Sequence, residues 1–408
     1  MSRRVVITGT GVLTPLGTDD KSIISALKQG ITGFEKSTIV ENSVVCPIND
    51  FNLIEYTGKF KNRRYLNRSA ALSVGAAIAA IKNAFLEPEM LHHAGLFVGA
   101  GPNLDIENEF PEIREGHTLW SKIQALWILK FLPNTAASTI AQLSGIHGEC
   151  ATLGTACAAS LQAIADAFRK IKDGYLDIAL AGGGDSRLSS SAMMAYKKAN
   201  AIYCGTDSPN LACRPFDKNR QGFVPGEGAA FFVMETYDHA VNRNANMLAE
   251  ILGCGMSMDA YRMTSPNPDA TIAEKALTQA LFQANLDIHD IDLISAHGTG
   301  TLLNDTMEAC LIKRLFPDDL PVVAIKSWIG HLSSACGAAE MAVCLACMNH
   351  GYIPEIRNLT DPCHMDINFI QSPKHIPFQT VLLENFGFGG QNCALIIRGI
   401  KNEKEKQT

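Results

Sequence analysis

The sequence predicts an α/β protein whose sheet is largely parallel and is covered by helices on both faces. Two observations predict this fold class. Short apolar runs alternate with longer segments of helical periodicity, and strands that are buried on both faces have such continuous apolar runs. The 408 residues are 47% hydrophobic, which is enough for sizeable cores in one large α/β body or in two or three domains.

The first half of the chain provides strands that run into glycine-rich turns, and helices rich in small residues. Residues 69–85 are rich in alanine and have helical spacing. Apolar residues recur at helical spacing from Leu161 to Ile171, which predicts an amphipathic helix that ends at Gly174. The strands predicted in this half are residues 5–8, 95–98 and 177–181, the last of which ends in three glycines.

The second half repeats this alternation. Asn304 is expected to cap a helix, with Asp305 and Glu308 in its first turn, where acidic side chains interact favourably with the helix dipole. We expect both acids to have a structural role. The elements predicted here are strands at residues 292–296 and 322–325 and helices at residues 304–316 and 331–350.

The two predicted halves, residues 1–245 and 246–400, contain one similar unit each. In both units a turn places a reactive side chain at the start of a helix of small and apolar residues. Cys157 takes this place in the first half and His331 in the second, so the pattern predicts a degenerate duplication. The polar and charged residues 401–408 are expected to be a disordered tail.

Composition excludes several classes of partner. With a net charge of −6 and 19% charged residues, the chain is not expected to bind nucleic acid or an anionic membrane. The apolar run at residues 5–8 is too short for a signal peptide or a membrane span. Twelve cysteines scattered through apolar stretches suit reduced thiols, so we expect a cytoplasmic protein.

Cys157 is the strongest single candidate for a reactive residue. It follows a short turn of small residues and lies in the first turn of the predicted helix. A helix N-terminus offers unpaired N–H groups and a partial positive charge. Because both favour a thiolate, we expect an acidified, nucleophilic cysteine. The alternative is a small buried cysteine that fills a gap.

Seven segments, in this order, match one family. The chain resembles the β-ketoacyl-acyl-carrier-protein synthases of the thiolase superfamily, and among them most closely the elongating type II synthases and the ketosynthase subunits of type II polyketide systems. The segments are residues 5–11 (VVITGTG), 155–158 (TACA), 214–218 (RPFDK), 222–228 (GFVPGEG), 297–301 (HGTGT), 326–331 (KSWIGH) and 386–390 (FGFGG).

The resemblance implies a thiolase-like fold in which two pseudo-duplicated βα halves form an αβαβα layered body. It also implies a decarboxylative condensation of malonyl-carrier protein with an acyl group on Cys157, in fatty-acid or type II polyketide elongation. The expected partners are an acyl carrier protein and a second subunit, in a homodimer or in a heterodimer with a chain-length-factor-like chain. No cofactor is expected, since the phosphopantetheine arm arrives on the carrier.

The resemblance also implies roles for the catalytic residues. Cys157 is the nucleophile that holds the acyl chain as a thioester. His297 and His331 donate hydrogen bonds to the malonyl thioester and stabilise the enolate left by loss of carbon dioxide. Lys326 orients the site electrostatically, and a buried lysine needs a carboxylate partner, for which Glu340 is the candidate.

Further roles concern the surroundings of the nucleophile. The backbone N–H groups of Cys157 and Phe388 form the oxyanion hole. Gly387, Phe388 and Gly389 belong to a mobile loop in which Phe388 is the gate between acyl pocket and malonyl site. Thr299 and Thr301 bind the pantetheine arm.

The chain also departs from the family pattern. Ser295, Gln391 and the pair Glu384–Asn385 replace residues that are commoner at a cation position described for parts of the family, so no metal ligand is assigned and a structural cation there stays open. Residues 199–202 replace a commoner arginine-containing stretch near the acyl pocket, where Tyr196 supplies an aromatic ring. These departures leave the acyl substrate open.

A basic run stands out in this acidic protein. Because acyl carrier proteins are strongly acidic, a local basic patch could steer and dock one. The alternative is a solvated helix face. The run comprises Lys59, Lys61, Arg63, Arg64 and Arg68, with Arg63 and Arg64 as the main candidates.

Three other functions fit the residues less well. A non-catalytic chain-length factor lacks the nucleophile, whereas Cys157, His297 and His331 are all present here. A thiolase needs a second catalytic cysteine, and the context of Cys393 near the glycine loop does not match one. A module that only binds ligands would not require the three reactive residues.

Overall fold

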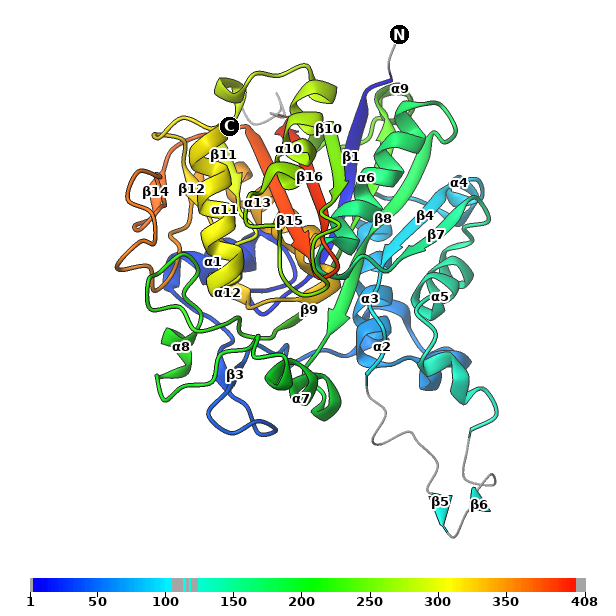
Figure 1. Cartoon of the computed structure of the whole chain (residues 1–408). Coiled ribbons are helices and arrows are strands. Elements are labelled where there is room, and N and C mark those ends of the chain that lie inside the picture. The colour runs from blue at the N-terminus through cyan, green and yellow to red at the C-terminus, as the bar shows by residue number, and fades with distance from the viewer. Residues whose placement is uncertain (1–2, 105–112, 115–116, 119–123, 401–408) are drawn as a thin grey trace.

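The computed structural model describes residues 3–104, 113–114, 117–118 and 124–400 (Figure 1). Within these residues, ten strands form one large sheet. Their spatial order is β12 (Val322–Val323), β11 (Leu293–Ser295), β15 (Thr380–Gly387), β16 (Gln391–Gly399), β10 (Ala249–Met258), β1 (Val5–Leu13), β9 (Glu227–Thr236), β8 (Ile178–Ser186), β4 (Gly95–Gly99) and β7 (Cys150–Leu153). The predicted tail at residues 401–408 lies outside the described residues.

The sheet order confirms the predicted duplication. Read outward from the centre, β10-β16-β15-β11-β12 in one half corresponds to β1-β9-β8-β4-β7 in the other. The halves join where β1 and β10 pair antiparallel, with Val5 opposite Ile251. The predicted boundary at residues 245/246 falls between α9 (Tyr237–Asn242) and β10.

The prediction of a largely parallel sheet is wrong, because the sheet is mixed. Parallel pairs occur at the outer strands, where β4 pairs with β7 and β8, and β11 pairs with β12 and β15. The central strands pair antiparallel, and β15 and β16 form a hairpin through residues 388–390. A hairpin connection requires antiparallel strands, and a buried apolar run does not reveal strand direction.

Helices form three layers around the two half-sheets. Apolar residues of two central helices share one core with inward-facing residues of both halves, and the other helices pack on the two outer faces. Figure 1 shows helices on both sides of the sheet. The central helices are α6 (Ala159–Lys172) and α13 (Cys336–His350), and the outer ones are α3 (Arg68–Asn83) and α5 (Thr135–Ser144) on one face and α10 (Thr271–Ala284) and α11 (Leu302–Leu315) on the other.

β8 continues through the three glycines at which the prediction ended it. A side chain at Gly183 would lie 2.6 Å from the carbonyl oxygen of Gly99, and one at Gly184 would lie 2.4 Å from Ser73 Oγ on α3. The glycines therefore allow α3 and the neighbouring strand to approach β8 closely. They mark close packing here and not a turn.

Short elements complete the described chain, in which no helix is long and apolar enough to cross a membrane. Side-chain caps explain several helix starts: Asp19 accepts from the Ser22 backbone, and Asn67 accepts from the Ala70 backbone at the start of α3. The remaining helices are α1 (Asp20–Gln29), α2 (Leu53–Thr57), α4 (Pro88–Leu91), α7 (Ser190–Lys198), α8 (Pro209–Ala212) and α12 (Lys326–Ile329), and the small sheets pair β2 (Glu35–Lys36) with β3 (Val44–Val45), β5 (Ile113–Arg114) with β6 (His117–Thr118), and β13 (Tyr352–Ile353) with β14 (Lys374–His375).

The central helix layer is predicted to carry much of the stability. Phe168 on α6 is 1% exposed in the shared core. Phe168→Ala should lower the free energy of unfolding by about 3–5 kcal/mol, because it removes buried apolar area and leaves a cavity. Urea unfolding measures this loss. Phe282→Ala is the control, since Phe282 is 88% exposed. A loss of similar size in both variants would contradict the claim that Phe168 is buried in the shared core.

Candidate active site

Cys157 lies at a sharp turn between a strand and a central helix. β7 ends at Leu153, and a 3₁₀ turn, Ala156–Ala158, leads into α6. Ala156 has φ of 48°, in the left-handed region that non-glycine residues rarely adopt. Such strained positions cluster at functional sites. The turn holds the thiol at the helix N-terminus, as predicted, where it lines a cavity.

The structure corrects the predicted counterpart of Cys157. In each half, a residue with positive φ starts a 3₁₀ turn that leads into a central helix: Ala156 in one half, and Ser333, with φ of 50°, in the other. The next residue is Cys157 in the first turn and Ser334 in the second. Ser334 is therefore the structural equivalent, and His331 lies three residues earlier.

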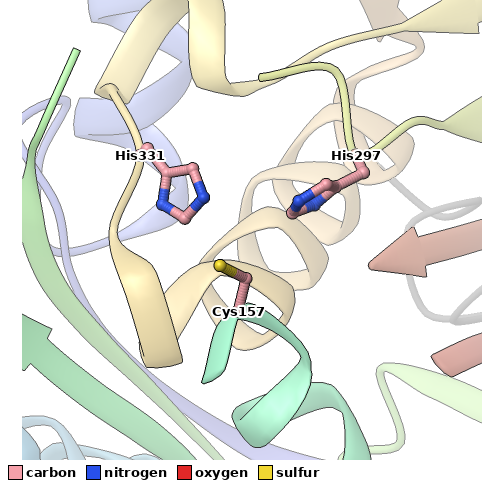
Figure 2. Close-up of side chains that lie close together, drawn as sticks. All are labelled: Cys157, His297 and His331. Carbon is pink, nitrogen blue, oxygen red and sulfur yellow. The ribbon is translucent and has the colours of Figure 1, made fainter. Parts of the chain in front are cut away.

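The three reactive side chains converge on one point. The ligand-type atoms of Cys157, His297 and His331 all lie within 4.8 Å of one another. Figure 2 shows the thiol between the two imidazole rings, each of which comes from a different segment. The ring centroids of the two histidines are 5.7 Å apart. They face a cavity of about 680 Å³.

Carboxylates of α11 build the turn that carries His297. Glu308 accepts from the backbone N–H of His297 at 2.5 Å and from that of Gly298 at 2.8 Å. Asp305 accepts from the backbone N–H groups of Thr299 and Gly300. Both acids are fully buried, which agrees with the structural role predicted for them.

The predicted cap of α11 is wrong. The helix starts at Leu302, and Asn304 lies within its first turn. The Asn304 amide donates to Glu308 at 2.9 Å and to Asp305 at 3.2 Å. It therefore braces the two acids that hold the His297 turn, instead of capping the helix.

Lys326 and Glu340 form a buried ion pair beside His297. Each residue is 1% exposed, and the ammonium donates to the Glu340 carboxylate. Burial, the largest single effect, lowers the pKa of Lys326, but the acidic neighbours together, chiefly Glu340, more than offset it, so the pKa is raised and the lysine is charged. The ammonium also donates to the His297 carbonyl oxygen at 2.5 Å and to His297 Nδ1 at 3.1 Å.

These donors assign the same tautomer to both histidines. At His297, Nδ1 accepts from Lys326 and lies 3.2 Å from the Asn385 amide nitrogen. At His331, Nδ1 accepts from the Ser333 backbone N–H at 2.9 Å. We therefore place the remaining proton on Nε2 of each ring. Both Nε2–H groups are then free to donate to a ligand.

Both histidines are neutral at physiological pH. Burial, with the charges of Lys326 and His331, holds the pKa of His297 well below its ordinary value of 6.5. Burial and the charge of Lys326 lower the pKa of His331 to about 3. The pair therefore supplies neutral hydrogen-bond donors, not cations.

The prediction of an acidified Cys157 is not supported. Burial raises the pKa of its thiol to about 11, while Lys326 and the Phe388 backbone N–H lower it. The helix start is present, but removal of the thiol from water outweighs it. Cys157 therefore rests as a thiol when the cavity holds no ligand.

The glycine-rich loop lies directly against the nucleophile. A side chain at Gly387 would lie 2.8 Å from the Thr155 carbonyl oxygen and 3.4 Å from the Cys157 nitrogen, so only glycine permits this approach. Phe388 is 42% exposed and lines the cavity together with Gly387 and Gly389.

The two threonines of the His297 turn line the same cavity. Their hydroxyl oxygens are 2.9 Å apart, and Thr299 Oγ1 also lies 3.2 Å from Asp305. Tyr196 lines the cavity as well, with its hydroxyl 3.3 Å from Ser333 Oγ. The cavity thus presents both apolar and polar groups near the thiol.

Two residues of the site were not predicted. Asp185 is the penultimate residue of β8, is fully buried, and accepts from the backbone N–H and the hydroxyl of Ser334. Asn385 donates to Glu340 at 2.9 Å and reaches His297. Two features of the sequence could have indicated them: Asp185 directly follows the three glycines of the predicted strand, and Asn385 directly precedes the glycine-rich loop.

The basic run is only partly exposed. Lys59, Lys61, Arg63 and Arg64 are on the surface. The structure corrects the prediction that Arg68 helps to dock a carrier protein. Its guanidinium makes two hydrogen bonds to Glu227 and a third to the Ile48 carbonyl oxygen. Its charge is thus neutralised within the fold, and it is unsuited to bind a partner.

At the family's cation position, buried oxygen atoms of Ser295, Glu384, Asn385 and Gln391 have no hydrogen-bond partner within the described residues. Among the residues that the structure describes, Cys157, His297 and His331 form the only group of three or more His, Cys, Asp or Glu side chains whose donor atoms lie within 4.8 Å.

The fold and the site together define a class of protein. A duplicated five-layered α/β body that brings a cysteine and two neutral histidines to one cavity is the arrangement of a thiolase-like condensing enzyme. The family description "Beta-ketoacyl synthase, N-terminal domain" matches residues 2–240, and "Beta-ketoacyl synthase, C-terminal domain" matches residues 248–360. The chain belongs to the β-ketoacyl synthase family and is a condensing acyltransferase.

Known proteins are similar along nearly the whole chain. A putative mitochondrial 3-oxoacyl-[acyl-carrier-protein] synthase of Schizosaccharomyces pombe is 34% identical over 97% of this chain and 99% of its own length. A β-ketoacyl synthase from Burkholderia phymatum has a TM-score of 0.91 and 30% identity over 98% of this chain and 100% of that one. The ishigamide ketosynthase/chain length factor structure has a TM-score of 0.88 and 29% identity, with the same coverage.

The neutral histidines predict how stability depends on pH. Because the folded-state pKa of His331 lies below 6.5, the unfolded chain binds a proton that the folded chain does not. Stability should therefore fall as the pH drops below about 6.5, by roughly 1 kcal/mol per pH unit for each such histidine.

Urea unfolding between about pH 7 and pH 5 tests this dependence. Other groups also titrate in this range, so the difference between the wild type and His331→Gln isolates the histidine. The variant should lose stability less steeply, and equal slopes for both proteins would show that His331 is not held neutral.

Proposed function

We propose that this protein catalyses a decarboxylative Claisen condensation between an acyl group on Cys157 and a malonyl group on an acyl carrier protein. One observation carries this proposal: a thiol and two neutral histidines converge in the lining of one cavity. A hydrolase or a transferase that only moves acyl groups would need a single oxyanion hole. Two histidine donors opposite the nucleophile suit a second oxyanion, that of an enolate.

In the first step, Cys157 Sγ attacks the thioester carbonyl of the acyl carrier. A new carbon–sulfur bond forms, and the carrier leaves as a thiol that takes the proton lost by Cys157. The backbone N–H groups of Cys157 and Phe388 would stabilise the intermediate oxyanion. Support comes from the Phe388 N–H, which already faces the thiol and lowers its pKa against the effect of burial.

In the second step, the malonyl carbon–carbon bond breaks and carbon dioxide leaves. The resulting enolate oxygen would accept hydrogen bonds from Nε2 of His297 and of His331. Its carbon then attacks the acyl carbonyl, and Cys157 departs as the leaving group. Neutral donors suit this step, because a cation would donate its proton and quench the carbanion.

Lys326 acts through His297 and not on the substrate. Its ammonium is bound to Glu340 and to His297 Nδ1, so it keeps Nδ1 an acceptor and Nε2 a donor. Thr299 and Thr301, which line the cavity, would bind the pantetheine arm. Phe388, in the glycine loop, would be the gate between the acyl pocket and the malonyl site.

A second candidate is narrower: the catalytic subunit of a specialised type II polyketide or polyene synthase, paired with a chain-length factor. The likeness to the ishigamide ketosynthase/chain length factor favours it. So does the polar cavity wall, where the buried pair Asp185–Arg187 and the Tyr196 hydroxyl lie near the thiol. Condensation by the purified chain alone would favour the homodimeric alternative.

Separating the two partial reactions tests the mechanism. Cys157→Ala should lower condensation by about a thousandfold or more. It should keep malonyl decarboxylation, because His297 and His331 remain. His297→Ala should lose both reactions, since it removes an enolate donor. Radiolabelled malonyl-carrier protein measures both rates, and full condensation by Cys157→Ala would refute the mechanism.

The basic surface predicts how the carrier protein binds. Arg63→Glu combined with Arg64→Glu should raise KM for the carrier roughly three- to tenfold, because it replaces attraction of an acidic partner with repulsion. Steady-state kinetics at low salt measures the change. Lys21→Glu with Lys28→Glu on α1 is the matched control, since both lysines are exposed. If KM rises equally in both double variants, the cause is the change in net charge and not the loss of a docking site at Arg63 and Arg64.

A further inference from the structure

Two hydroxyl groups form a pair in the cavity wall beside the reactive residues. Tyr196 comes from α7, and Ser333 starts the 3₁₀ turn before α13. Both residues line the cavity that Cys157 lines, and their hydroxyl oxygens are 3.3 Å apart. Ser333 also contacts His331, because its backbone N–H donates to Nδ1 of that ring. The pair therefore lies next to the reactive groups, in a wall that the proposed mechanism does not use.

The pair has one more proton than its own hydrogen bond requires. Each hydroxyl carries one proton and two acceptor lone pairs. Burial, chiefly, raises the pKa of Tyr196 to about 12, so its hydroxyl keeps the proton at neutral pH. One proton forms the bond between the two oxygens, and within the described part of the chain neither hydroxyl has a second partner. The remaining proton is thus available to an acceptor in the cavity.

Packing and backbone contacts hold both hydroxyls in place. The Tyr196 ring lies edge-on to Phe223, with ring centroids 5.2 Å apart, and the Phe223 ring lies 4.7 Å from that of His331. Ser333 is buried, and its backbone bond to His331 fixes the segment that carries its hydroxyl. Hydrogen-bonding groups that are fixed in advance lose little freedom when a ligand binds, so they suit selective recognition.

The same wall contains an ion pair whose charges cancel. Asp185 and Arg187 are buried, with an N–O distance of 3.0 Å. The Arg187 guanidinium also donates to the Pro102 carbonyl oxygen, and all three residues line the cavity. A carboxylate on the acyl chain would add a charge that this wall does not balance, which is costly in a buried place. A neutral oxygen avoids this cost.

We propose that Tyr196 and Ser333 form a subsite for a keto or hydroxyl oxygen of the acyl chain on Cys157, and that they select a neutral, oxygenated acyl group over a saturated one. The inference rests on the proposed function, which puts the acyl chain in this cavity. An oxygen near the thioester accepts the remaining proton of the hydroxyl pair. A saturated chain would cover that proton without offering it a partner, and this loss is the source of the selectivity.

Acylation by matched pantetheine thioesters tests this selectivity. The probes are hexanoyl, β-hydroxyhexanoyl and β-ketohexanoyl pantetheine, and mass spectrometry of the intact protein follows the rate at which each probe acylates Cys157. The oxygenated probes should acylate the wild type about tenfold faster than the hexanoyl probe, because only they satisfy the hydroxyl pair. Equal rates, or faster acylation by the hexanoyl probe, would overturn the proposal.

Variants show whether the hydroxyl pair causes the preference. Tyr196→Phe combined with Ser333→Ala should abolish it, since both hydroxyls are removed while the backbone N–H that binds His331 stays. Each single variant keeps one donor, so its preference should lie between those of the wild type and the double variant. Tyr175→Phe is the matched control, because Tyr175 is 73% exposed, and it should keep the full preference. A preference that persists in the double variant would come from the probes themselves and would refute the proposal.

Binding of matched pantetheine amides separates the subsite from the proposed reaction. The amides cannot transfer their acyl groups, so Kd values from calorimetry report recognition alone. The β-hydroxyhexanoyl amide should bind the wild type about tenfold more tightly than the hexanoyl amide, and the double variant should bind both equally. This preference without any condensation would refute the proposed function and keep the subsite. Condensation without the preference would keep the proposed function and refute the subsite.

Discussion

A buried ammonium governs the chemistry of this cavity. Lys326 is almost inaccessible to water, and a charge in such a place requires compensation from its neighbours. Glu340 supplies the counter-charge, and the remaining hydrogen-bonding capacity is directed at His297. The same positive charge disfavours protonation of both imidazoles. One ion pair therefore fixes which atom of His297 can donate and, together with burial, keeps both histidines neutral.

The duplicated fold explains how distant residues reach this ion pair. Two central helices, α6 and α13, start at equivalent 3₁₀ turns of the two halves. The first turn presents Cys157, and the second presents Ser334, which binds Asp185 of the other half. Equivalent positions of the two halves therefore have different roles: Cys157 is the nucleophile, and Ser334 makes a structural hydrogen bond to Asp185. His297 follows β11, and His331 lies just before the second turn, in the connection from β12 to α13.

The sequence was sufficient for the reactive trio and for the pairing of Lys326 with Glu340, because these residues lie in motifs of fixed order. It was insufficient where long-range packing decides the outcome. The extension of β8 through Gly182–Gly184 depends on how closely α3 packs, and the acidity of Cys157 depends on burial that is invisible locally. Likewise, Arg68 appears as one more cation of a basic run until Glu227, 159 residues away, takes its charge.

The central claim is that both histidines are neutral Nε2–H donors. Burial and the charge of Lys326 keep both rings neutral, while Lys326 fixes the tautomer of His297 and the Ser333 backbone N–H fixes that of His331. Nitrogen NMR of ¹⁵N-histidine-labelled protein, with assignments from His297→Gln and His331→Gln, measures tautomer and charge directly. The account predicts the neutral Nε2–H form for both rings between about pH 5 and pH 8, below and above the ordinary histidine pKa. An imidazolium signal, or a proton on Nδ1 of either ring, would contradict it.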